Sequence, residues 1–89
     1  MQVMVELSLY PLVDEFIPPI KAFIERLNSY ETLTVTTCST STQVHGSYSE
    51  VMAILGAEMQ RTHEDVGQAV FVAKFLNYDA MSSRQANHD

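Results

Sequence analysis

Strict alternation along residues 3–10 is the feature that most limits how this chain can fold. Apolar side chains there alternate with a mixed set that contains a carboxylate, a hydroxyl and a phenol. Because successive side chains of a strand point to opposite faces, one face carries Val3, Val5, Leu7 and Leu9 and the other carries Met4, Glu6, Ser8 and Tyr10. The first face requires a core. The pattern therefore predicts a sheet that helices cover on one side only.

The size and charge of the chain narrow the class of protein. Its 89 residues predict a single domain over residues 1–80, followed by a polar tail over residues 81–89. With 46% apolar and 18% charged residues, the chain has few charges to coat its surface, which favours a homo-oligomer. The net charge of −6 opposes contact with phosphate backbones, so we expect no nucleic-acid partner.

Cysteine usage and hydropathy bear on the compartment. Cys38 is the single cysteine, so the chain forms no intrachain disulfide. No apolar run is long enough to cross a bilayer, and the N-terminus lacks the basic and apolar regions of a signal peptide. We therefore expect a cytoplasmic protein that does not insert into membranes.

Further periodic segments follow the first strand. An apolar stripe from Phe16 to Leu27 predicts a helix with Asp14 as its N-cap, and Pro18 and Pro19 are tolerable only in its first turn. Ser47 and Glu50 have the spacing of a capping box at the start of a second helix. Strands are predicted over residues 33–38, over residues 42–45 with a stop at Gly46, and over residues 69–76. Gly56, inside the second helix, predicts a close contact between that helix and the sheet.

The predicted order is β-α-β-β-α-β, which is the ferredoxin-like arrangement of the α+β class. Both helices are expected on one face of a four-stranded antiparallel sheet, with the strands in the order 4-1-3-2. Strand 1 is then interior and lies beside strand 4. If Lys74 shares the open face of that sheet, it pairs with Glu6.

No catalytic or metal-binding motif is visible. His45, His63 and His88 are scattered over a predicted strand, a helix and the tail, without the spacing of metal ligands. Cys38 has no nearby histidine in the sequence that would activate it as a nucleophile, so it is expected to be a buried or edge cysteine. We therefore expect no metal, no cofactor and no enzymatic activity.

Hydroxyl groups cluster over residues 36–42, where the second and third predicted strands are joined. Hydroxyls donate and accept hydrogen bonds, so they suit a heterocycle that carries amino groups and ring nitrogens. Tyr10 offers a flat surface for stacking, and the carboxylate of Glu6 suits a cation. The alternative is purely structural, because Thr favours strands and Ser favours turns.

Short motifs resemble those of the YkoF-type proteins that bind thiamine and hydroxymethylpyrimidine. They are Ser-Leu-Tyr-Pro-Leu at residues 8–12, Ser-Thr-Gln-Val-His-Gly at residues 41–46 and Lys-Phe at residues 74–75. The resemblance implies a ferredoxin-like domain that assembles into dimers or tetramers and binds the pyrimidine moiety of thiamine without catalysis. It also implies ligand contacts by Ser8, Tyr10, Ser39, Thr40 and Thr42. Strand geometry adds Glu6 and Lys74 as candidates.

Three functions remain open at this point. The first is a non-enzymatic protein that binds thiamine or hydroxymethylpyrimidine for salvage or transport. The second is a structural or regulatory interaction module whose open sheet face serves assembly, with apolar contacts from Met4, Tyr10, Val72 and Leu76. The third is a small enzyme, for which His45 is the only histidine in a predicted strand.

Overall fold

Strands and helices follow one another in the predicted order. The computed structural model describes residues 1–77, so the predicted boundary at residue 80 and the tail at residues 81–89 lie outside the described residues. The elements are β1 (Gln2–Pro11), α1 (Ile17–Asn28), β2 (Thr34–Thr37), β3 (Thr42–Ser47), α2 (Tyr48–Val66) and β4 (Ala69–Leu76).

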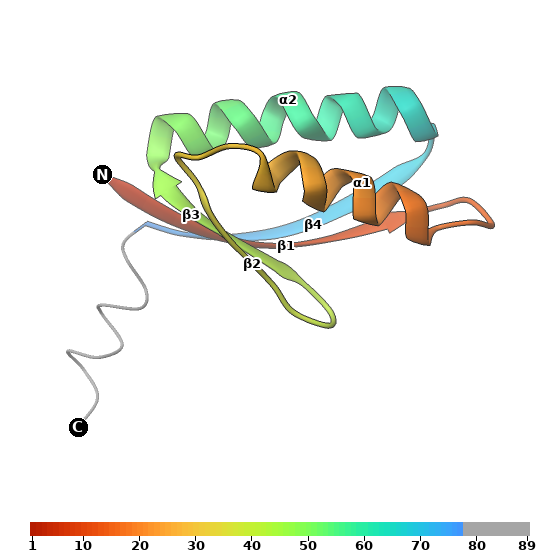
Figure 1. The fold of residues 1–89 in the computed structure, drawn as a ribbon, viewed down its shortest axis with the longest axis horizontal. Helices are drawn as coiled ribbons and strands as arrows, with labels where there is room; N and C mark the ends of the chain where they lie inside the picture. The colour runs from red at the N-terminus through yellow and green to blue at the C-terminus, as the bar shows by residue number, and fades with distance from the viewer. Residues whose placement is uncertain (78–89) are drawn as a thin grey trace.

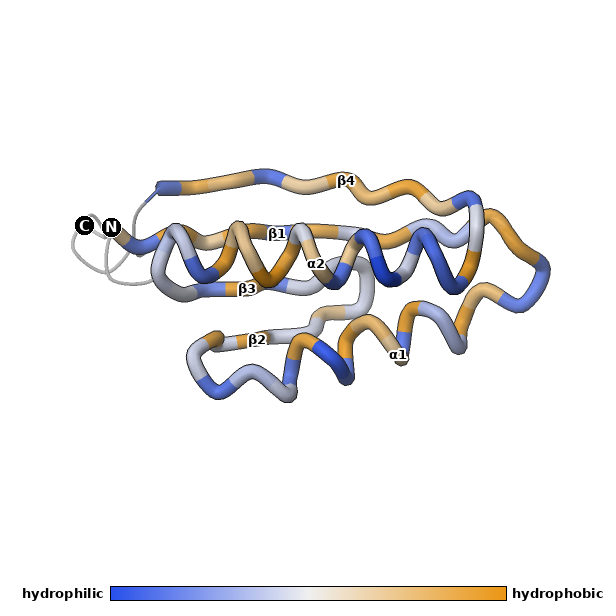
Figure 2. The backbone as a smooth tube through the Cα atoms, turned by 90° about the horizontal axis from the view of Figure 1, so that it is seen from above, coloured by the Kyte–Doolittle hydropathy of each residue, from blue (hydrophilic) through white to orange (hydrophobic). Residues whose placement is uncertain are grey.

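The four strands form one antiparallel sheet in the order β2-β3-β1-β4, as predicted. Both helices lie on the same side of this sheet (Figure 1). Seen from above, β1 lies between β4 and β3, and α1 lies on the side of β2 (Figure 2). The chain therefore has the ferredoxin-like α+β fold.

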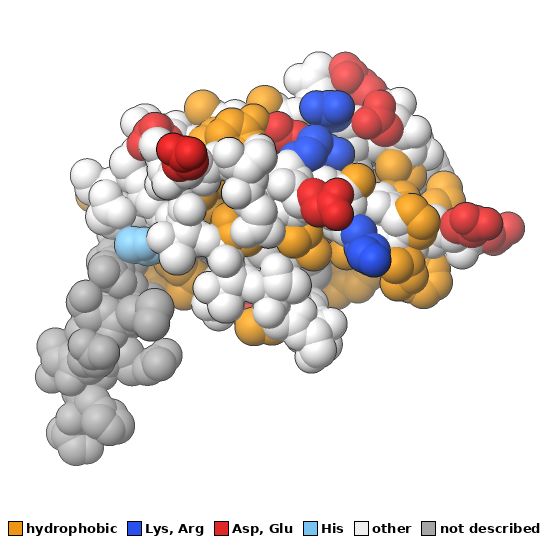
Figure 3. All heavy atoms as spheres, in the orientation of Figure 1, with side chains coloured by type: hydrophobic (Ala, Val, Ile, Leu, Met, Phe, Trp, Pro, Cys, Tyr) orange, Lys and Arg blue, Asp and Glu red, His pale blue; other side chains and the backbone are white. Residues whose placement is uncertain are grey.

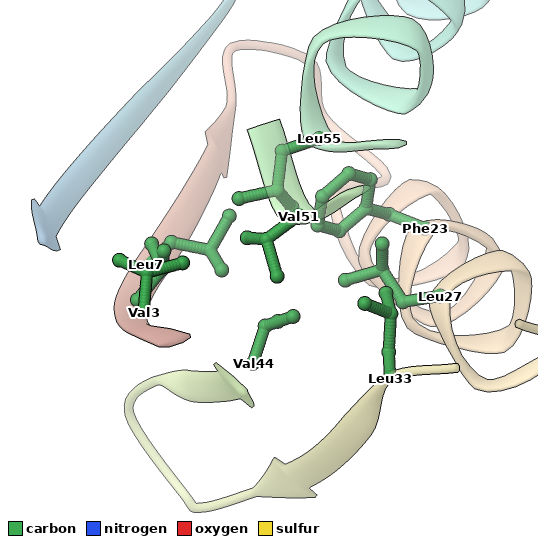
Figure 4. Close-up of a cluster of buried hydrophobic side chains, with 9 residues drawn as sticks. Val3, Leu7, Phe23, Leu27, Leu33, Val44, Val51 and Leu55 are labelled. Carbon is green, nitrogen blue, oxygen red and sulfur yellow. The ribbon is translucent and has the colours of Figure 1, made fainter. Parts of the chain in front are cut away.

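The alternating face of β1 supplies the centre of the core. Val3, Val5 and Leu7 are at most 2% exposed. Val3 and Leu7 lie in one cluster with side chains from both helices (Figure 4). The buried apolar cluster consists of Val3, Val5, Leu7, Phe23, Leu27, Leu33, Val44, Val51 and Leu55. Each helix thus contributes residues at helical spacing, which is the stripe that the sequence predicts.

The start of α1 differs from the prediction. Its N-cap is Phe16 instead of Asp14, and no side chain caps the helix. Pro18 and Pro19 lie in the first turn, where their fixed φ suits a helix and their missing N–H groups would have no helical partner. The two prolines therefore set where the helix begins, and Asp14 stays in the preceding loop.

The start of α2 agrees with the predicted cap. The Ser47 hydroxyl accepts a hydrogen bond from the Glu50 backbone N–H at 3.4 Å and donates one to the Glu50 carboxylate at 3.0 Å. The helix ends at Gly67, which adopts a φ of +93°. Within residues 1–77, no helix is both long and apolar enough to cross a membrane.

Two glycines have roles opposite to those predicted. Gly46 does not stop β3, which continues to Ser47. A Cβ at Gly46 would lie 3.2 Å from side-chain atoms of Leu33 and Val51, so the missing side chain permits a close approach to β3. A Cβ at Gly56 would meet nothing within 4 Å, so the predicted close contact of α2 at this position is wrong.

A polar cluster joins the two helices beside the core. The Glu58 carboxylate accepts a hydrogen bond from Arg26 Nε at 2.5 Å and another from the Tyr30 hydroxyl at 2.6 Å. Arg26 Nη2 also donates to the Thr62 hydroxyl at 2.8 Å. Glu58 and Thr62 are both buried, at 7% and 2% exposure. Burial of a charge is tolerated here because each polar group has a partner.

Candidate functional site

The site begins where β1 continues beyond its neighbour β3. The pairing of β1 with β3 ends at Leu7 and Thr42, whereas its pairing with β4 continues to Pro11. Residues 8–11 therefore have a strand partner on the β4 side only. Figure 2 shows that β1 continues past the end of the β2–β3 hairpin and that the first half of α1 runs alongside this extension.

A pocket of about 560 Å³ lies at this step in the sheet. Its lining comes from the end of β1 with the loop that follows, from α1, and from the β2–β3 hairpin. The lining residues are Leu7, Ser8, Leu9, Tyr10, Pro11, Leu12, Phe16, Ile20, Phe23, Ile24, Thr37, Cys38, Ser39, Thr40, Ser41 and Thr42. A volume of this size suits a small organic molecule.

One wall of the pocket is apolar. Phe16, Ile20, Phe23 and Ile24 recur at the spacing of one helical face, so α1 turns a continuous apolar surface toward the pocket. Phe23 is 2% exposed and belongs to the core, whereas Phe16 is 50% exposed. The wall thus extends from the core to the surface, and a planar ring can pack against it.

The opposite wall is the hydroxyl-rich hairpin. The Cys38 N–H donates to the Ser41 carbonyl at 2.8 Å, which closes the turn. The Ser8 hydroxyl donates to the Thr40 carbonyl at 2.9 Å, and the Ser41 hydroxyl donates to the Glu6 carboxylate at 3.1 Å. These two bonds hold the hairpin against β1 beyond the end of the strand ladder.

Five of the seven predicted site residues line the pocket. Ser8 and Tyr10 come from β1, Ser39 and Thr40 from the hairpin turn, and Thr42 from the first position of β3. Tyr10 is 54% exposed, while Thr42 is 6% exposed and lies on the helix-covered side of the sheet. Segments about thirty residues apart in the chain are thereby brought to one cavity.

Glu6 and Lys74 lie elsewhere, on the open face of the sheet. They are direct register partners across β1 and β4, and their charged groups are 3.9 Å apart. The Lys74 side chain is 84% exposed, so this ion pair contributes little to stability. Neither residue lines the pocket.

Sequence reasoning missed the apolar wall. The α1 stripe has the periodicity of a core face, and part of it is indeed core, so the sequence contains no signal that the N-terminal half of the stripe faces a cavity. Cys38 is not buried: it follows the edge strand β2, in agreement with the edge alternative of the prediction, and it is exposed and lines the pocket. Leu12 and Thr37 also line it. The pocket lies where β1 continues past the β2–β3 hairpin, and this step exists only in the assembled sheet.

The chemistry of the pocket is neutral. Among the described residues that line it, none is a histidine, a carboxylate, a lysine or an arginine. His45 lies on the open face, opposite Met4, and is not part of the lining. Within residues 1–77 there is also no group of three or more potential ligands that could hold a metal ion. The arrangement suits hydrogen bonding and packing around an uncharged ring.

The open face of the sheet carries exposed apolar side chains. Tyr10 and Val70 are register partners, and Val72 is the register partner of Ser8. Tyr10, Val70 and Val72 are 54%, 45% and 53% exposed. Neither helix covers this face, because both lie on the other side (Figure 1). The predicted assembly residues Met4, Tyr10, Val72 and Leu76 fall on this face together.

Comparison with known proteins supports the fold. No family model matches the chain, and no curated protein matches it. Among solved structures, protein SP2199 from Streptococcus pneumoniae has a TM-score of 0.84 at 21% identity, over 100% of both chains. The Methanocaldococcus jannascii protein MJ1052 has a TM-score of 0.78 at 22% identity, over 96% of this chain and 94% of its own.

A third solved structure has a functional name. The Thermotoga maritima protein TM0486, called a "putative thiamine biosynthesis/salvage protein", has a TM-score of 0.78 at 19% identity, over 91% of this chain and 87% of its own. These identities are low, so the three structures show that the fold is shared. The ligand of this chain must therefore be inferred from the residues that line its own pocket.

Proposed function

We propose that this chain binds thiamine or its hydroxymethylpyrimidine moiety without catalysis, as a cytoplasmic homo-oligomeric carrier in salvage or transport. The observation that carries the proposal is the uncharged pocket with one hydroxyl-rich wall and one apolar wall. An aminopyrimidine needs both: hydrogen-bonding groups at its edge and an apolar surface against its ring.

Three further points support this ligand. The Ser-Leu-Tyr-Pro-Leu run that resembles the YkoF-type family forms one side of the pocket, at residues 8–12. The thiamine-related name of the Thermotoga protein, which shares the fold, agrees with that resemblance. The described residues of the lining include no charged side chain, and its hydroxyls and apolar side chains match the edge and the face of an aminopyrimidine ring.

Calorimetric titration with thiamine and with hydroxymethylpyrimidine tests the proposal. Thr40→Trp places a bulky side chain at the hairpin wall and is expected to abolish saturable binding, whereas Thr32→Trp, at an exposed position outside the lining, is expected to leave it intact. Tyr10→Ala is expected to weaken binding about tenfold through loss of ring packing. The matched control is Tyr48→Ala, because Tyr48 is exposed and lies outside the pocket. If neither compound binds the wild-type protein, the proposal is wrong.

The second candidate function is an interaction module that uses the open sheet face. Its specific support is the exposure of Val70 and Val72 beside Tyr10 on that face. Val72→Lys is expected to dissociate an assembly that depends on this face, while Thr32→Lys, at an exposed position outside the sheet, serves as a control for added charge. Light scattering measures the mass of each variant. An unchanged mass for Val72→Lys would argue against this function.

A further inference from the structure

The charge of the pocket implies which forms of the ligand can bind. We propose that the pocket selects unphosphorylated ligands and rejects their phosphate esters. This proposal rests on the proposed function. The neutral heterocycle would enter the space between α1 and the hairpin. Phosphate groups carry negative charge and are commonly held by cationic side chains. No lysine, arginine or histidine is present among the described residues that line the pocket.

The nearest helix start lacks the usual means of binding an anion. Helix N-termini attract phosphate through N–H groups that have no helical partner, and α1 begins beside the pocket, with Phe16 and Ile20 in the lining. Pro18 and Pro19 occupy its first turn and have no N–H group to offer. Two donors are therefore missing at the end of α1 where a phosphate would otherwise be held.

The described basic side chains are placed away from the lining. Arg26 is held by Glu58, Arg61 lies 3.9 Å from Asp65, and Lys74 pairs with Glu6 on the open face. Lys21 is exposed on α1, one residue after Ile20 and thus about 100° around the helix from it. On the face seen in Figure 3, basic side chains lie among acidic ones over the helices. None of these four basic side chains lines the pocket.

Two hydroxyls of the pocket are also already committed. Ser8 donates its proton to the Thr40 carbonyl, and Ser41 donates its proton to Glu6. A phosphate beside them would meet a carbonyl and a carboxylate within the same hydrogen-bonded network. The chain adds long-range repulsion, because its net charge is −6. Each of these features disfavours an anion, whereas the oxygens of the same two hydroxyls can still accept hydrogen bonds from an amino group of a neutral ring.

Titration with four ligands that differ in their phosphate groups provides the test. Hydroxymethylpyrimidine, thiamine, thiamine monophosphate and thiamine diphosphate are titrated into the wild-type protein under identical salt. The two unphosphorylated compounds are expected to bind, and the diphosphate is expected to bind at least about tenfold more weakly than thiamine. Diphosphate affinity equal to or above that of thiamine overturns the selectivity while leaving the proposed function standing. Absence of binding by all four compounds overturns the proposed function itself.

A variant that gains affinity for the diphosphate provides a second test, which does not depend on measuring weak binding by the wild-type protein. Thr40→Lys adds a cation to the exposed hairpin turn and is expected to raise diphosphate affinity about tenfold, with a steep loss of that gain as salt increases. Thr32→Lys adds the same charge outside the lining and is expected to have little effect. If Lys21→Gln removes diphosphate binding from the wild-type protein, Lys21 is an anion contact and the proposed rejection of phosphate is wrong.

Discussion

Glu58→Gln is expected to lower the free energy of unfolding by about 2 kcal/mol. The carboxylate accepts hydrogen bonds from Arg26 and from Tyr30 between the two helices, and it is 7% exposed. Breaking a fully buried ion pair costs about 3–5 kcal/mol. The cost here is smaller because glutamine keeps one acceptor oxygen. In addition, the Arg26 side chain is 18% exposed, so its charge relaxes toward water.

Urea unfolding followed by circular dichroism measures this effect, since the chain has no tryptophan. For a domain of this size, 2 kcal/mol corresponds to a fall of about 2 M or less in the unfolding midpoint. Glu64→Gln is the matched control: Glu64 lies on the same helix, is exposed, and accepts a hydrogen bond only from Gln60 among the described contacts. Its effect should stay within about 0.5 kcal/mol. Equal midpoints for the two variants would refute the structural role of the cluster.

The difference in stability between the wild-type protein and Glu58→Gln should depend on pH, and the sign of that dependence follows from the pKa of Glu58. Burial raises the pKa of the Glu58 carboxyl, but hydrogen bonds from Tyr30 and Arg26 outweigh burial and hold that pKa below its ordinary value of 4.5. A lowered pKa means that the ionised form stabilises the fold. This contribution is present above pH 4.5 and is lost as the pH falls through the folded-state pKa. The stability difference between wild type and Glu58→Gln should therefore shrink below that pH, and a difference that grows there would contradict the sign.

Four further substitutions have expected outcomes. Gly46→Ala should destabilise the protein by about 1–3 kcal/mol because its Cβ would press on side chains at 3.2 Å, whereas Gly56→Ala should stabilise it by about 1 kcal/mol, both by thermal unfolding. Leu27→Ala, at a fully buried position, should cost about 2–5 kcal/mol in urea unfolding. Ser8→Ala removes the bond to the hairpin carbonyl at residue 40 and should lower the free energy of unfolding by about 1 kcal/mol in urea unfolding, while an unchanged midpoint would show that this bond does not stabilise the turn.

The sequence predicts the fold well because its strongest signals are local. Alternation in residues 3–10 defines a two-faced strand, and helical periodicity around Phe23 and Leu55 defines the elements that cover one face. Right-handed crossovers then leave few topologies for the order β-α-β-β-α-β. Alternation also assigns residues to faces, and Glu6 and Lys74, whose pairing the sequence predicts if they share the open face, are register partners there. Ser47 likewise caps α2, because a cap depends only on residues three apart.

Only the tertiary structure shows the pocket and the features that depend on contacts between residues far apart in the sequence. The polar half of the pocket could be foreseen from the hydroxyls of the hairpin, but its apolar wall is an α1 stripe with the same periodicity as a core face. Gly46 is tightly packed and Gly56 is open, and nothing local distinguishes the two. Glu58 is buried because Arg26 and Tyr30 approach it from positions 32 and 28 residues away. Local pattern determines which elements form, whereas the space between elements depends on their lengths and on contacts that arise only after they pack.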